Sequence, residues 1–240
     1  MGHTFVSDRS PSGIGELTDK LTELRRRGYV SSLRKGNTGI GCTLESLLGI
    51  TENNLKLPDL GIVELKSQRN MATNRVTMFT FNRGVWKLKQ RELIETYGYI
   101  DTEGRPSLYC TVSAHPNNQG LFIRVDRSRV RLYQLDKTLI AEWHGEHLIS
   151  AFKKKMLALV MVYADTRTNS NGKEEFWFNE AYLLTQPDTS NLLELIRAGS
   201  IVVDIRMHLK ESGVVRNHGT GFRIDQKFMK LCFGKRKRLA

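Results

Sequence analysis

The chain has 240 residues, of which 40% are hydrophobic and 26% are charged. A chain of this length buries roughly 70% of the surface that it exposes when unfolded, which excludes any need for disulfide staples. No apolar run approaches the roughly 20 residues of a membrane helix, and the polar N-terminal residues around Asp8 predict no secretory signal.

The net charge is +12, from 37 Lys and Arg against 25 Asp and Glu, and the basic residues are spread along the chain. Such a balance favours a polyanionic partner, because each neutralised phosphate releases counterions. Nucleic acid is the leading candidate, and a merely soluble basic protein is the alternative. No strongly amphipathic basic helix supports a membrane surface. Three widely spaced cysteines form neither a metal motif nor a disulfide framework, so we expect buried free thiols and a cytoplasmic location.

The first third of the chain predicts two helices and a strand. Leucines at helical spacing predict a helix over residues 16–27, which Gly28 ends. After a glycine-rich loop at 35–41, residues 42–49 carry a second apolar stripe and end at another glycine. Residues 61–67 are typical of a strand, and their apolar neighbours indicate a central one.

The rest of the chain alternates between strand and helix patterns. Strands are predicted over residues 75–82, 108–114, 121–125, 129–134, 157–163, 175–184, 201–209 and 220–224. Helices are predicted over residues 87–97, 146–157, 189–198 and 226–233. The chain is therefore expected to be a mixed α/β (α+β) protein with one compact body, which a cleft divides into two lobes.

The stretch P-D-L-G-I-V-E-L-K-S at residues 58–67 is the candidate catalytic site. Side chains alternate along a strand, so Glu64 and Lys66 share a face. Asp59 has the wrong parity, but it follows Pro58 and precedes Gly61, where a bend turns it toward the same side. Two carboxylates at a strand end suit Mg²⁺, and a lysine beside them suits phosphodiester hydrolysis. The alternative is a solvated strand face.

Glu45 adds a third carboxylate fourteen residues before Asp59, on the predicted helix at 42–49. Taken alone it is more typical of an exposed helical glutamate. Together, T-L-E-S-L-L-G, P-D and G-I-V-E-L-K form an ordered set. This set resembles the PD-(D/E)xK nuclease superfamily, and within it the MutH-like branch that contains the MvaI/BcnI restriction endonucleases.

The resemblance implies a restriction-endonuclease-like core sheet flanked by helices, with two lobes around a DNA cleft. It implies a catalytic lobe at about 1–100 and a recognition lobe at about 101–240. The implied catalytic set is Glu45, Asp59, Glu64 and Lys66. Asp59 and Glu64 would bind one or two Mg²⁺ ions, and Glu45 would position a water or bind a second ion.

The strand at 201–209 carries the candidate reading residues, since Asp204, Arg206 and His208 share one face. Arginine pairs with guanine O6 and N7, and aspartate accepts from cytosine N4. A salt bridge between strands is the alternative. The glycine-containing segment at 216–224 supplies further donors. By resemblance, Arg216, His218 and Arg223 would contact other bases or phosphates.

The resemblance implies a type II restriction endonuclease that cuts double-stranded DNA at a CCNGG-like site, CCWGG or CCSGG. The unlike halves favour a monomer that nicks the two strands in sequence. A cognate DNA methyltransferase is implied in the cell, though not as a bound partner. Two alternatives stay open: a MutH-like strand-nicking enzyme of mismatch repair, and a DNA-binding protein without catalysis.

Overall fold

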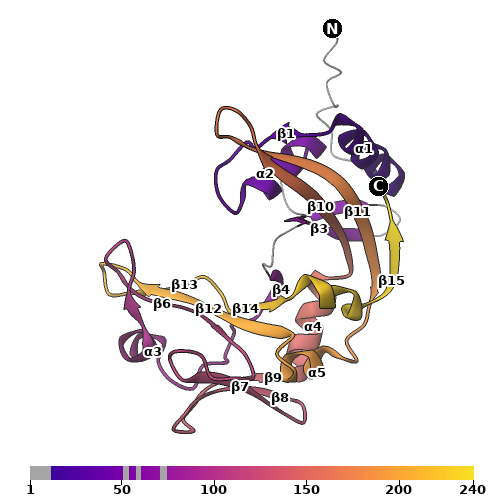
Figure 1. The fold of residues 1–240 in the computed structure, drawn as a ribbon. Coiled ribbons are helices and arrows are strands. Elements are labelled where there is room, and N and C mark those ends of the chain that lie inside the picture. The colour runs from indigo at the N-terminus through magenta and orange to yellow at the C-terminus, as the bar shows by residue number, and fades with distance from the viewer. Residues whose placement is uncertain (1–11, 51–53, 58–60, 71–74) are drawn as a thin grey trace. The chain divides into compact units, whose positions relative to one another are not determined.

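The computed structural model describes residues 12–50, 54–57, 61–70 and 75–240 as a strand-rich α+β structure (Figure 1). The chain divides into two compact units, which we treat separately. Unit 1 comprises Met1–Thr73, Met156–Pro187 and Phe233–Ala240, and unit 2 comprises Asn74–Lys155 and Asp188–Cys232. The chain thus leaves unit 1 and returns to it twice, whereas the sequence suggested a single boundary near residue 100. No helix in the described ranges is long and apolar enough to cross a membrane.

Unit 1 is built on a sheet with the strand order β1-β11-β10-β3-β2, in which β15 also pairs with β11. The strands are β1 (Val30–Ser31), β2 (Asn54–Leu57), β3 (Gly61–Arg69), β10 (Ala158–Thr168), β11 (Glu174–Pro187) and β15 (Phe233–Arg238). Strand β3 runs parallel to β10 and antiparallel to β2. It therefore lies inside the sheet, which confirms the central strand expected at 61–67.

Two helices, α1 (Ile14–Arg27) and α2 (Gly39–Leu48), bury their apolar stripes in the core of unit 1. Leu17, Leu21 and Leu24 of α1 are all buried, as the helical spacing predicts. In α2, Leu44 and Leu48 are buried, and Gly49 ends the helix in the left-handed conformation at φ 70°. This packing fixes the rotation of α2 and so decides where Glu45 projects.

Unit 2 contains a sheet with the order β4-β14-β12-β6-β5, in which β13 also pairs with β12. The strands are β4 (Val76–Thr80), β5 (Tyr99–Ile100), β6 (Pro106–Val112), β12 (Ile201–Leu209), β13 (Val215–Asn217) and β14 (Gly221–Ile224). Val203, Ile205 and Met207 of β12 are buried apolar residues. The opposite face of the strand carries the polar residues Asp204 and Arg206, as the alternation predicts.

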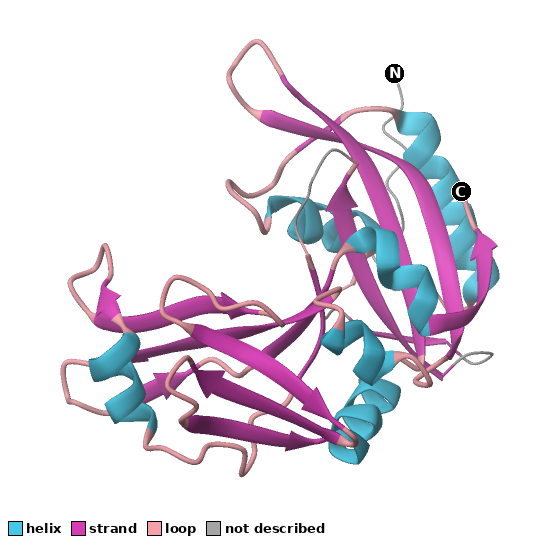
Figure 2. Cartoon of the chain, turned by 60° about the horizontal axis from the view of Figure 1, so that its bottom comes forward, coloured by secondary structure: helices cyan, strands magenta, loops and turns pink. Residues whose placement is uncertain are grey.

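A second sheet in unit 2 has the order β7-β8-β9 (Figure 2). Its strands are β7 (Leu121–Asp126), β8 (Arg129–Gln134) and β9 (Leu139–His144), and the helical segments of the unit are α3 (Gln90–Tyr97), α4 (Gly145–Lys155), α5 (Leu192–Arg197) and the 3₁₀ helix η1 (Gln226–Cys232). An aromatic cluster holds the unit together: Phe79 stacks on Phe222 at 4.8 Å, and Trp143 meets Phe222 edge-on at 5.8 Å.

The arginine series on β7 and β8 is divided between structural and solvent-facing roles. Nη1 of Arg129 and Nε of Arg131 each donate to a different oxygen of Glu142, both at 2.7 Å. The hydrogen bond from Arg131 lowers the pKa of Glu142, and the positive charges of Arg129, Arg131 and Lys87 act in the same direction. Both arginines therefore stabilise the β8–β9 pair, while Arg124 stays exposed.

Candidate active site and nucleic-acid interface

Glu64 and Lys66 form a close charged pair on the central strand of unit 1. Oε1 of Glu64 lies 2.7 Å from Nζ of Lys66, and the two residues share one face of β3. The Glu64 side chain is only 1% exposed, and the Lys66 side chain is 25% exposed. A buried carboxylate is costly unless it is paired or metal-bound, so this is not the solvated strand face that the sequence also allowed.

Glu45 lies on α2, which packs against β3. It is half-buried, and burial raises the pKa of its carboxyl group, with the positive charge of Lys66 acting in the opposite direction. The structure therefore brings Glu45 into the electrostatic range of Lys66, across the junction of α2 and β3. Glu45 is therefore not the fully exposed helical glutamate that the sequence also allowed.

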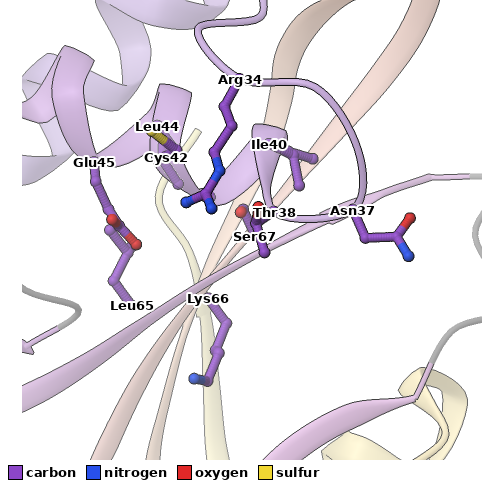
Figure 3. Close-up of a pocket in the computed structure, with 11 residues that line it drawn as sticks. Arg34, Asn37, Thr38, Ile40, Cys42, Leu44, Glu45, Leu65, Lys66 and Ser67 are labelled. Atoms are coloured by element: carbon purple, nitrogen blue, oxygen red, sulfur yellow. The ribbon is translucent and has the colours of Figure 1, made fainter. Parts of the chain in front are cut away.

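A pocket of about 330 Å³ opens beside these residues (Figure 3). Its walls come from three segments: the loop before α2, the first turns of α2, and the middle of β3. The lining mixes polar and apolar residues, which include Arg34, Asn37, Thr38, Ile40, Cys42, Leu44, Glu45, Leu65, Lys66 and Ser67. The side chains of Glu45 and Arg34 lie on one side of β3, and that of Lys66 projects from the other side (Figure 3).

The donor set fits a hard divalent cation, although it is incomplete without Asp59, which lies outside the described residues. Glu64 and Glu45 supply the carboxylate oxygens that Mg²⁺ prefers. Within the described ranges, no group of three or more His, Cys, Asp or Glu residues is clustered tightly enough to hold a metal. The site therefore requires the Asp59 carboxylate, or several water ligands, to complete the coordination of an ion.

On the polar face of β12, Asp204 is held by two neighbours. Its Oδ1 accepts from the Thr111 hydroxyl at 2.7 Å, and its Oδ2 pairs with Nη1 of Arg223 at 2.5 Å. The salt bridge considered from the sequence thus exists, and its cation is Arg223. An ionised carboxylate has about four acceptor sites, so this bonding still leaves room for a base.

Arg206 lies between Asp204 and His208 on the same strand, facing Tyr109 of β6. Its Nε is buried, and this atom has no hydrogen-bond partner among the described residues. Its Nη2 lies 3.4 Å from the position that a Cβ on Gly221 would occupy. A glycine here leaves space beside the guanidinium, and the guanidinium keeps donors available for a ligand.

Two histidines and a tyrosine lie together beside this arginine. Nδ1 of His208 lies 2.9 Å from the Tyr109 hydroxyl and 3.4 Å from Nε2 of His218. His208 is buried, whereas His218 is exposed on the loop between β13 and β14, and Arg216 lies in β13 just before that loop. The structure therefore brings the expected reading residues of unit 2 to one polar face.

We expect His218 to titrate below the usual histidine range. Its pKa is lowered first by partial desolvation of the ring and then by electrostatic repulsion from His208, Arg216, Arg206 and Arg105. At neutral pH it is consequently uncharged, with one donor and one acceptor nitrogen. Chemical shifts of the ring protons, followed by NMR across the acidic range, measure this directly. A midpoint above 6.5 would contradict the expectation.

Sequence reasoning missed several members of these clusters. Thr111 and Tyr109 sit on β6, where an alternating strand pattern gives no hint of their partners 93 and 99 residues away. Arg34 was part of an unassigned loop segment. The contacts of Thr111 and Tyr109 depend on the register between β6 and β12, which local periodicity does not encode.

Comparisons with known proteins agree with this geometry. The sequence model of the MvaI/BcnI restriction endonuclease family matches residues 18–233. The solved structure of a restriction endonuclease MvaI–cognate DNA substrate complex is similar at 28% identity and a TM-score of 0.76, covering 97% of this chain and 100% of that one. The structure of MvaI in the absence of DNA is similar at 25% identity and a TM-score of 0.53, covering 100% and 99%. A search of curated proteins finds no significant match.

Proposed function

The chain belongs to the MvaI/BcnI restriction endonuclease family and is a type II site-specific endonuclease, and from this premise we propose that it hydrolyses double-stranded DNA with Mg²⁺ at a CCNGG-like sequence. The observation that carries the proposal is the Glu64–Lys66 pair, buried at 2.7 Å on the central strand of unit 1. The solved complex of MvaI with cognate DNA supports DNA as the substrate.

The proposed chemistry divides the work among Glu45, Asp59, Glu64 and Lys66. Asp59 and Glu64 would hold Mg²⁺, which supplies charge neutralisation at the phosphate and acidifies a bound water. Lys66 orients the attacking water and neutralises charge that builds on the phosphate oxygens. Water adds across the ester bond: its oxygen binds phosphorus, the P–O ester bond breaks, and the departing oxygen takes a proton. Glu45 holds a second water, or a second ion, at the edge of this site.

The polar face of β12 is proposed to read the DNA sequence. Arg206 has the donors for guanine O6 and N7, and Asp204 retains acceptor capacity for cytosine N4. His208 and His218 are proposed to contact bases near the centre of the site, with Arg216 and Arg223 contributing to bases or phosphates. An Asp and an Arg two residues apart on one strand face suit a C·G pair, which supports CCWGG or CCSGG as the target class.

We further propose that the enzyme acts as a monomer. One set of catalytic residues per chain cuts one strand, so a double-strand break requires the enzyme to nick, release and rebind in the opposite orientation. In the cell, a methyltransferase of the same specificity would protect the host DNA, because an unprotected genome contains many five-base sites.

Incubation of supercoiled plasmid with the protein and Mg²⁺ is expected to give discrete linear fragments through a nicked intermediate. A time course on agarose gels checks the order of products, and sequencing of the fragment ends gives the target. EDTA is the control for the metal. If no plasmid or phage DNA in a broad set is cut, the proposal fails. If nicked circles persist as the final product, the chain is instead a MutH-like strand-nicking enzyme.

A further inference from the structure

Arg34 is the cation of the Glu45 pocket that the catalytic set does not use. It is exposed on the loop before α2, and its guanidinium reaches toward the same opening as the Glu45 carboxylate (Figure 3). In the described part of the chain, its side chain forms neither an ion pair nor a hydrogen bond; the bonds recorded for Arg34 are those of its backbone with the Ser32 hydroxyl. Because its guanidinium is not bonded to any acceptor of the described residues, all five of its N–H donors are available for a ligand.

The loop that carries Arg34 is firmly built. Arg69 of β3 is clamped by both oxygens of Glu174 at 2.7 and 2.8 Å, and it also donates to the carbonyls of Gly36 and Asn37 at 3.3 and 3.5 Å. At the other end, the Leu33 amide donates to the Thr43 hydroxyl of α2 at 3.0 Å. These bonds fix both sides of the loop and therefore the place from which Arg34 reaches.

The turn into α2 is also tightly packed. A Cβ at Gly39 would lie only 2.2 Å from the Arg34 carbonyl oxygen, so only glycine allows this approach. The Ser32 hydroxyl donates to the same carbonyl at 2.7 Å. A binding group on a fixed loop loses little entropy when it engages a ligand.

Two neutral donors share the pocket with Arg34. The Thr38 and Ser67 side chains both line it, and Thr38 makes no capping bond with the helix backbone. Glu64 and Lys66 occupy one face of β3, whereas Ser67 has the opposite parity. The Arg34 end of the pocket is thus displaced from the pair that performs the proposed chemistry.

We propose that Arg34, Thr38 and Ser67 form a subsite for a phosphate group of the cut DNA strand next to the scissile phosphate, with Arg34 as the charged, positioning residue. This subsite rests on the function proposed above. A guanidinium and two hydroxyls match the oxygens of a phosphodiester in charge and in hydrogen bonding. Holding the neighbouring phosphate fixes the strand along its axis, so the scissile bond is delivered in register to Lys66.

Binding to DNA without catalysis is the first test. The probe is a fluorescent duplex that contains the mapped cleavage site, or a plasmid-derived duplex if none is found, titrated in EDTA over a series of salt concentrations. Arg34→Ala is expected to reduce the slope of log K against log salt by about 0.9, the value for one phosphate contact. Lys35→Ala is the matched control: it removes the same charge from the next residue of the loop, and Lys35 does not line the pocket. Its slope is expected to equal that of the wild type.

Replacing single phosphates by uncharged methylphosphonates is the second test. At one position beside the scissile phosphate, the replacement is expected to weaken binding and slow single-turnover cleavage by the wild type, but to add nothing in Arg34→Ala. Arg34→Lys keeps the positive charge but loses the bidentate guanidinium. Its losses of affinity and cleavage rate should therefore lie between those of the wild type and Arg34→Ala. Thermal melting of each variant confirms that the chain is folded.

The outcomes separate this subsite from the proposed function. If Arg34→Ala keeps the wild-type salt slope, or if its defect adds to every methylphosphonate, the subsite is wrong even when DNA is cut normally. If the slope falls by the expected amount while the wild type cuts no DNA, the phosphate contact stands and the nuclease function fails.

Discussion

Lys66→Ala is expected to abolish most DNA cleavage while DNA binding persists. Loss of a group that assists proton transfer or stabilises charge in the transition state typically costs 10²–10⁴-fold in rate, and we expect a fall of roughly that size. Single-turnover cleavage of plasmid measures the rate, and a gel-shift assay in EDTA measures binding. Equal rates for the variant and the wild type would remove Lys66 from the active site.

The control for Lys66→Ala must address folding, because Lys66 is the 2.7 Å ion-pair partner of a Glu64 side chain that is 1% exposed. Removing one partner of a buried pair leaves an uncompensated charge and is strongly destabilising. Lys66→Arg keeps the positive charge beside Glu64 but changes its shape and basicity. We expect this variant to melt near the wild-type temperature and still to cut slowly, which separates catalysis from stability.

Arg206→Ala is expected to give the second large effect, a loss of sequence-specific affinity. A bidentate contact to guanine contributes about 1–3 kcal/mol, so affinity for the target should fall roughly 5- to 150-fold. Binding to unrelated DNA should change much less, because only the specific complex uses the contact. Fluorescence anisotropy with the mapped target, and with duplexes that replace one C·G pair at a time, measures both quantities.

The same set of duplexes identifies which base pair Arg206 reads. At that pair, the replacement should weaken the wild type and leave Arg206→Ala unchanged, and at other pairs it should weaken both. Arg124→Ala is the matched control, since Arg124 is an exposed arginine of unit 2 on β7 rather than on the β12 face. If the two variants lose specificity equally, the β12 face does not read the DNA as proposed.

The elements that position the catalytic residues were predictable because their patterns are local. Leucine spacing predicted the helix at 42–49, but α2 begins at Gly39, so the last three residues of the loop predicted at 35–41 are helical. Alternation with apolar flanks predicted β3, which extends two residues beyond the expected end. Strand β15 was missed because Phe-Gly-Lys-Arg-Lys-Arg lacks strand periodicity and reads as a basic tail. The segment is a strand because it pairs with β11, and its own sequence pattern does not predict this pairing. The Asp59 prediction lies outside the described residues and stays a prediction.

In unit 2, the sequence predicted which residues of β12 share a face but not which residues they contact. The bounds of β12 agree with the expected strand. The Asp204–Arg223 pair depends on the register in which Val202 of β12 lies opposite Arg223 of β14. Such a register is set by the hydrophobic surfaces of both strands and by the turns between them. The same limit explains why the Arg34 loop gave no signal: its anchors, Thr43, Arg69 and Glu174, come from three separate segments.

The order of strands in unit 1 has a consequence for the enzyme during its own synthesis. Glu45, Glu64 and Lys66 leave the ribosome early, but β3 gains its neighbour β10 only when residues 158–168 have followed. Strand β15 joins β11 later still, after every residue of unit 2 has been made. Long-range pairings of this kind form slowly, because the intervening chain must first be closed into a loop. A nascent chain therefore carries Glu45, Glu64 and Lys66 before the sheet that contains β3 is complete, and that sheet gains its last strand only after all of unit 2 has been translated.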